Sequence, residues 1–127
     1  MSTQLRTPLG RVRGLGSAKN GTAHWWIQRL TALLLVVTLP WFIWLLLSTA
    51  GADYVTLRLT LAQPLNAVML LLLVIGAFWH AQLGLQVVIE DYLHGGLEIA
   101  LQILVKFACL AAGIASVIAI GRIAFGS

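Results

Sequence analysis

The sequence predicts an all-α membrane protein with three transmembrane helices. Of its 127 residues, 60% are hydrophobic and 9% are charged, and the mean hydropathy is +0.94. A soluble domain has roughly 25% charged residues, so this chain lacks the polar surface that a water-soluble fold needs. One crossing uses roughly 20 apolar residues, so three crossings would use about 60, which the length of the chain allows.

The charge and cysteine content exclude other classes of protein. The net charge of +4 and the pI near 10.0 come from a small surplus of basic residues in a nearly charge-free chain, which does not indicate nucleic acid as a partner. The single cysteine, Cys109, cannot form an internal disulfide and is predicted to be a small packing residue. Composition therefore argues against a soluble enzyme, a nucleic-acid-binding protein and a disulfide-rich secreted module.

The first predicted helix covers residues 25–49. The chain is uncharged between Arg29 and Asp53, and this stretch is long enough to cross a bilayer. Pro40 predicts a mild kink within it, which neighbouring helices can accommodate.

The second and third predicted helices cover residues 64–89 and 99–121. Pro64 favours the start of the second helix, because proline is tolerated in the first turn. Lys106 interrupts the third helix but can extend toward the nearer membrane surface. Residues 50–63 and 90–98 are then the connections, and the Gly95–Gly96 pair predicts a break between helices.

Orientation is predicted from the amino-terminal end. Residues 1–24 form a basic segment with no acidic residue, and residues 25–127 form the membrane anchor domain. By the positive-inside rule the basic segment lies in the cytoplasm or the mitochondrial matrix. In a bacterial inner membrane, the location we expect, this end is cytoplasmic and the carboxyl terminus is periplasmic. The alternative is that the segment is a transit peptide, which would place the chain in the mitochondrial inner membrane.

The histidine within the second predicted helix is the main candidate for a site. His80 lies at membrane depth, where an imidazole needs a polar partner. Gly76 and Gly84 share its helical face, and they would either open a flat slot for a haem or allow close helix packing. His24 and His94 are expected at the inner surface, so a second histidine ligand would have to come from a partner chain.

Asp91 and Tyr92 form a second candidate site. Asp91 is 11 residues beyond His80, which is about 20° from three full turns and roughly 16 Å along a helix axis. The pair would be either a solvated helix end with an interfacial aromatic anchor, or a carboxylate and a phenol that hold a lipid-soluble quinone by its carbonyl oxygen. The residue spacing leaves both interpretations open.

Arg29 also has two interpretations. It stands at the inner end of the first predicted helix, next to His24, Trp25 and Trp26. It would be either an interfacial anchor beside the tryptophans, or a guanidinium that binds a carboxylate such as a haem propionate.

Residues 80–95, HAQLGLQVVIEDYLHG, resemble the second-helix signature of the succinate dehydrogenase membrane anchor, the D subunit of respiratory complex II. That family carries a histidine, a glycine four residues later and an Asp-Tyr pair at offsets 11 and 12. Residues 9–19, LGRVRGLGSAK, and residues 24–29, HWWIQR, also resemble its bacterial members. Together with the three-crossing layout, the resemblance extends over most of the chain.

The resemblance implies a role for each matching residue. His80 would be an axial ligand of haem b, and thus of its iron, with Arg29 near a haem propionate. Tyr92 would donate a hydrogen bond to ubiquinone, and Asp91 would support that site. The second haem histidine would come from a C-type anchor subunit, with which this chain would pack into a haem-binding helical bundle.

The implied function is the anchoring of succinate dehydrogenase and the reduction of ubiquinone. The iron-sulfur subunit would share the quinone site, and the flavoprotein subunit would oxidise succinate, so this chain would not be the catalytic subunit. Membrane lipid would cover its surface. The alternatives are a fumarate reductase anchor, a purely structural membrane subunit without cofactor, and a small transport or assembly factor.

Overall fold

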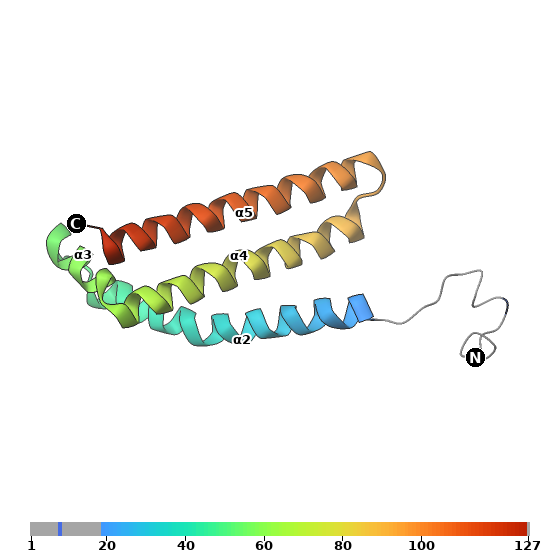
Figure 1. Ribbon diagram of the computed structural model, residues 1–127. Coiled ribbons are helices and arrows are strands. Elements are labelled where there is room, and N and C mark those ends of the chain that lie inside the picture. Colours follow the sequence, from blue (N-terminus) through green and yellow to red (C-terminus); the bar gives the residue numbers. More distant parts are fainter. Residues whose placement is uncertain (1–7, 9–18, 127) are drawn as a thin grey trace.

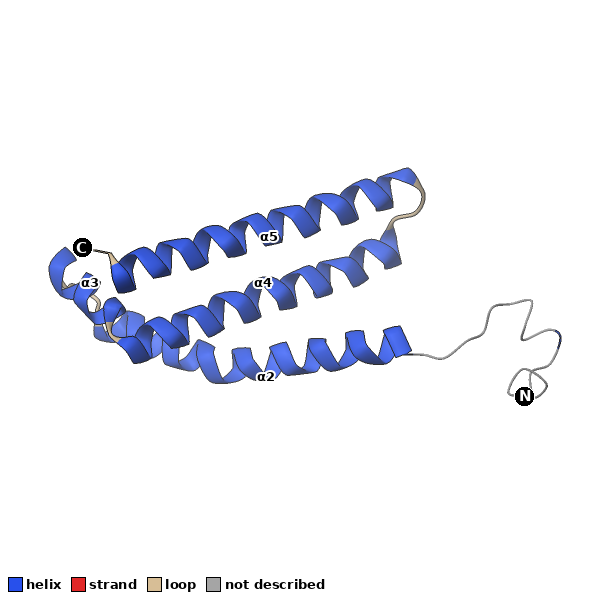
Figure 2. Cartoon of the chain, viewed as in Figure 1, coloured by secondary structure: helices blue, strands red, loops and turns tan. Residues whose placement is uncertain are grey.

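The computed structural model describes residue 8 and residues 19–126. In this part of the chain the ordered elements are helices α2 (Lys19–Ser48), α3 (Tyr54–Ala62), α4 (Pro64–Tyr92) and α5 (Gly96–Phe125). Figure 2 shows helices and loops and no strand among these residues. Three of the described helices, α2, α4 and α5, are long and apolar enough to cross a membrane. The all-α fold with three spans is confirmed.

The long helices extend further than the sequence predicted. α2 begins at Lys19 rather than at residue 25, and α5 covers Gly96–Phe125 rather than residues 99–121. The prediction treated charged residues as helix ends, but a helix can continue through polar residues once it leaves the hydrocarbon layer. The part of the basic segment before Lys19, apart from Pro8, lies outside the described residues.

Residues 50–63, predicted to be the connection between the first two spans, contain a short further helix, α3, that was not predicted from the sequence. Asp53 is the N-cap residue of α3. A hydrogen bond from the Thr56 hydroxyl, and then hydrogen bonds from backbone N–H groups of the first turn, lower the pKa of the Asp53 carboxyl group. At the other end, buried Asn66 of α4 donates a side-chain hydrogen bond to the Thr60 carbonyl at 2.8 Å. Arg58 donates to the Gly126 carbonyl at 3.4 Å, which joins α3 to the end of α5.

The three long helices form a layer in which α4 lies in the middle (Figure 1). α4 packs against both α2 and α5, and these two outer helices do not contact each other within the described residues. The start of α2, the end of α4 and the start of α5 lie at one end of the layer, and α3 lies at the other. The start of α2 therefore lies at the end of the layer where Asp91 and Tyr92 are found.

Close helix packing occurs on both sides of α4, but it is tighter against α2. A Cβ atom added at Gly76 would lie 2.9 Å from Leu34 Cδ2, whereas one at Gly113 of α5 would lie 3.8 Å from the Phe78 Cβ. The backbone at Gly76 is thus in close contact with α2, and the space beside it is filled by Leu34.

The predicted break between the second and third spans is confirmed. Gly95 has a φ of 75°, a left-handed conformation that favours glycine. The turn at residues 93–95 is shorter than the predicted 90–98, because α4 continues to Tyr92 and α5 begins at Gly96. Pro40 lies inside α2, which continues beyond it to Ser48.

Candidate functional site

His80 lies on the side of α4 that packs against α2. It is 12 residues before the end of α4, or about 18 Å at 1.5 Å per residue, which places it well inside the span. Its Nδ1 atom is 3.0 Å from the hydroxyl oxygen of Thr31. Thr31 is 6% exposed, so this polar contact is buried at the crossing of the two helices.

The other ring nitrogen of His80 has no partner in the described part of the chain. Thr31 contacts only Nδ1, and no hydrogen bond to Nε2 is formed by residues 19–126. The side chain is half-buried, and Nε2 is not enclosed by this chain's own atoms. A polar nitrogen left unpaired in hydrocarbon is costly, so the arrangement is suited to a ligand or partner from outside the chain.

The two glycines that flank His80 have different surroundings. At Gly76 the space is taken by Leu34, so the predicted slot is absent there and the close-packing interpretation holds. At Gly84 the nearest atom to an added Cβ would be Gln28 Nε2, at 4.0 Å. Gln28 also has a buried side-chain oxygen without a hydrogen-bond partner in the structure. Gly84 and Gln28 are therefore close to each other where α2 and α4 pack together.

A single histidine with one unpaired ring nitrogen could serve as one ligand of a haem, with a further ligand supplied by another chain. The imidazole has one nitrogen held and one free, and beside it are a glycine with space for a Cβ atom and an unpaired amide oxygen. No three histidine, cysteine or carboxylate side chains gather anywhere in the described residues. His80 would thus act as a single ligand rather than as part of a metal cluster built by this chain.

Asp91 and Tyr92 lie at the end of α4. The helix is continuous from His80 to both residues, so the predicted 20° offset between His80 and Asp91 applies. Tyr92 is 80% exposed and Asp91 is also exposed, and the side chain of neither makes a hydrogen bond to another described residue. The adjacent Glu90 differs, because its carboxylate accepts a hydrogen bond from Gln86 at 3.0 Å.

Arg29 points away from His80. Its guanidinium lies over the Trp25 ring, 5.2 Å from the ring centroid, an arrangement typical of a cation–π contact. Because Arg29 is two residues before Thr31, it lies about 200° around α2 from the side that faces His80. Trp25 and Trp26 pack edge to face with their ring centroids 5.1 Å apart, which forms an aromatic cluster at this end of α2.

The polar residues that sequence reasoning missed are on α2. Gln28, Thr31 and Thr38 recur at spacings of three and seven residues, which places them on one face of a helix. Thr31 and Thr38 are both buried toward the rest of the protein. This periodic line of uncharged polar residues inside an apolar span is the signal that could have identified the partner of His80.

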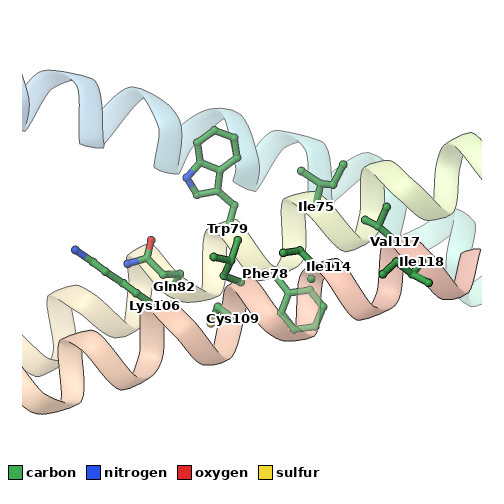
Figure 3. Close-up of a pocket in the computed structure, with 11 residues that line it drawn as sticks. Ile75, Phe78, Trp79, Gln82, Lys106, Cys109, Ile114, Val117 and Ile118 are labelled. Carbon is green, nitrogen blue, oxygen red and sulfur yellow. The ribbon is translucent and has the colours of Figure 1, made fainter. Parts of the chain in front are cut away.

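A groove runs between α4 and α5 (Figure 3). Its lining residues Phe78 and Gln82 are each two positions from His80, which is about 200° around α4, so the groove is on a different side of the helix. Its volume is about 500 Å³, and most of its walls are apolar. Gln82 and Lys106 are its polar members, and half-buried Cys109 also lines it. The groove contains neither His80 nor the Asp91–Tyr92 pair, so it is separate from the candidate site.

Three apolar spans in one layer, with a single histidine deep inside, define a small helical membrane anchor protein. Residues 3–120 match the family model described as succinate dehydrogenase/fumarate reductase transmembrane subunit.

Several succinate dehydrogenase hydrophobic membrane anchor subunits are similar to the chain. That of Rickettsia bellii (strain RML369-C) is 39% identical over 73% of this chain and 74% of its own length. That of Rickettsia conorii (strain ATCC VR-613 / Malish 7) is 34% identical over 94% of this chain and 97% of its own length. The subunit of Paracoccus denitrificans is 31% identical over 95% and 94%, respectively. No solved structure matches the chain.

The chain belongs to the family of succinate dehydrogenase/fumarate reductase transmembrane subunits, and within it to the succinate dehydrogenase hydrophobic membrane anchor subunits.

Proposed function

We propose that this anchor subunit holds a b-type haem through His80 and helps to deliver electrons from succinate to ubiquinone. The observation that carries the proposal is the Nε2 atom of His80, which lies inside a membrane span and has no hydrogen-bond partner among the described residues. A histidine used only for packing would have both ring nitrogens satisfied by neighbouring groups, because unpaired polar atoms are costly in hydrocarbon.

His80 would bind the haem iron through Nε2, and Gly84 and Gln28 would face the bound group. A haem of this kind takes up and releases single electrons at its iron. The second axial histidine would come from a C-type anchor subunit, since His24 lies near the start of α2 and His94 in the turn after α4. Arg29 would leave Trp25 to bind a haem propionate.

Asp91 and Tyr92 would form this chain's part of the ubiquinone site. A phenol hydroxyl can donate a hydrogen bond to a quinone carbonyl, and a nearby carboxylate can pass protons from the aqueous side. Both side chains are exposed at the end of α4, so they are accessible to a quinone and to other subunits. The iron-sulfur subunit would complete this site, and succinate oxidation would take place on the flavoprotein subunit.

The ubiquinone site would lie at the cytoplasmic side of a bacterial inner membrane. The start of α2, which contains residues 19–24 of the basic segment, lies at the same end of the layer as the end of α4 and the start of α5 (Figure 1). By the positive-inside rule this end is cytoplasmic and the carboxyl terminus is periplasmic. The quinone would then be reduced on the side from which its protons are taken.

The substitution Tyr92→Phe tests the quinone role in the purified complex. It removes the hydroxyl while keeping the ring, so ubiquinone reduction with succinate should fall about 10- to 100-fold, as expected for the loss of one hydrogen bond worth about 1–3 kcal/mol. Electron transfer to a soluble artificial acceptor should stay near the wild-type rate. Tyr54→Phe is the matched control, because Tyr54 is equally exposed but lies on α3 at the other end of the layer.

The other outcomes separate the competing functions. Equal loss of both activities in Tyr92→Phe would indicate failed assembly rather than a quinone contact. A complex that reduces fumarate with quinol faster than it oxidises succinate would indicate a fumarate reductase anchor. A wild-type complex without haem and without quinone reduction would indicate a purely structural membrane subunit.

A further inference from the structure

The hydroxyl of Thr31 is within hydrogen-bonding distance of three groups, two backbone carbonyls and one imidazole nitrogen. Its oxygen is 2.9 Å from the Ile27 carbonyl and 3.0 Å from the Gln28 carbonyl, both on its own helix. It is also 3.0 Å from His80 Nδ1 on α4. Because the side chain is buried and anchored to the backbone of α2, the position of the oxygen is fixed relative to the imidazole.

The number of available protons determines which group donates in the hydrogen bond between the Thr31 hydroxyl and His80 Nδ1. A threonine hydroxyl has one proton and can also accept, whereas a carbonyl oxygen only accepts. If the Thr31 proton goes to the carbonyls, the oxygen accepts the proton of Nδ1–H, and every hydrogen has an acceptor. If Thr31 instead donates to Nδ1, the ring proton sits on Nε2, which has no acceptor in the described residues. The first arrangement avoids an unpaired donor inside the span.

We propose that Thr31 is a positioning residue that keeps His80 protonated at Nδ1 and presents the lone pair of Nε2 to the haem iron. This inference rests on the proposed haem-binding role of His80. A histidine ligand whose other nitrogen donates a hydrogen bond has a fixed ring orientation and is a more basic ligand. A more basic ligand stabilises the oxidised iron relative to the reduced iron, and ligand hydrogen bonding of this kind sets haem potentials.

The close packing of α2 on α4 makes the contact possible. Gly76 lies one turn before His80, and Leu34 lies three residues after Thr31, so the tight contact at Gly76 is directly beside the hydrogen bond. The absence of a side chain at Gly76 lets the two backbones approach, which brings a short hydroxyl side chain within reach of the imidazole.

The test compares three variants in the purified complex by redox titration of the haem. Thr31→Val removes the hydroxyl at nearly constant volume, and the haem midpoint potential should shift upward. Thr31→Ser keeps a hydroxyl and should stay at the wild-type potential. Thr38→Val is the matched control, because Thr38 is also buried on α2 but its hydroxyl contacts only the Leu34 carbonyl of the same helix.

The outcomes distinguish this inference from the proposed function. Loss of haem in Thr31→Val, with haem kept in Thr31→Ser and Thr38→Val, would also support it. A wild-type potential in haem-containing Thr31→Val would overturn it, and so would an equal shift in Thr38→Val, which would indicate a general packing effect. A wild-type complex without haem would overturn the proposed role of His80 and this inference with it.

Discussion

Thr31 and Thr38 lie seven residues apart on the same face of α2, yet their hydroxyls differ in what they contact. Thr38 is 1% exposed and donates to the Leu34 carbonyl, as threonines in apolar helices commonly do. Thr31 makes the same kind of bond within α2 and also contacts His80. The difference between two similar residues is what makes the His80 contact specific.

Individual residues were predictable from the sequence to different degrees. His80 could be identified because a histidine inside an apolar span needs a reason to be there. Thr31 is visible in the sequence only as a member of a polar line on α2, because a threonine can satisfy its hydroxyl within its own helix. Its contact with the imidazole depends on the crossing of α2 and α4. The different roles of Gly76 and Gly84 also depend on this crossing, since their spacing from His80 is the same.

Arg29 gives a prediction about charge near the haem. If its guanidinium binds a propionate, Arg29→Ala should lower the haem midpoint potential, because a nearby cation favours the reduced form. This is the opposite sign to the shift expected for Thr31→Val. The measurement is redox titration of the purified complex, with Arg58→Ala at the far end of the layer as the control. An unchanged potential in a fully assembled Arg29→Ala complex would leave Arg29 as an interfacial anchor held on Trp25.

At the scale of the elements, the three spans follow from the sequence and α3 does not. Long uncharged stretches specify α2, α4 and α5, and only their ends differ from the prediction by a few residues. α3 is nine residues long and contains several β-branched side chains, and short helices of this kind are marginal on their own. It is stabilised by hydrogen bonds with residues outside it, namely Asn66 in the first turn of the next helix and Gly126, which is 68 residues from its partner Arg58.

The two helix interfaces of α4 should respond differently to added volume. Gly76→Ala places a Cβ atom 2.9 Å from Leu34, so we expect destabilisation of about 1–3 kcal/mol from overpacking. Gly113→Ala is the matched change on the other side, where the new Cβ atom would be 3.8 Å from Phe78, an ordinary contact. The measurement is thermal unfolding of the purified complex. Equal effects of the two substitutions would contradict the assignment of the α2–α4 contact as the tighter one.

At the scale of the whole molecule, this chain buries little apolar surface within itself. Its buried apolar side chains are few, while most side chains of the three spans are exposed. Lipid and other subunits must cover this surface in the membrane, because a flat layer of three helices leaves both broad faces of α4 open (Figure 1). The sequence predicted the membrane class from composition, but it contains no information on which side chains of a partner would complete the layer.

The arrangement of polar groups follows the same division. His80, Asp91 and Tyr92 are all on the continuous helix α4. His80 is inside the layer, and Asp91 and Tyr92 are at the end of the layer where α2 begins. The Nε2 atom of His80 and the side chains of Asp91 and Tyr92 have no hydrogen-bond partner among the described residues. We therefore interpret the chain as supplying one part of a haem site and one part of a quinone site.

The most direct test of this account is the haem spectrum of the complex purified with His80→Ala. The wild-type complex should show a low-spin b-type haem with two histidine ligands in its reduced-minus-oxidised spectrum. His80→Ala should lose this haem or convert it to a high-spin form, while His94→Ala, which changes an exposed histidine in the turn after α4, should keep the wild-type spectrum. An unaltered low-spin haem in His80→Ala would contradict the assignment of His80 as the ligand.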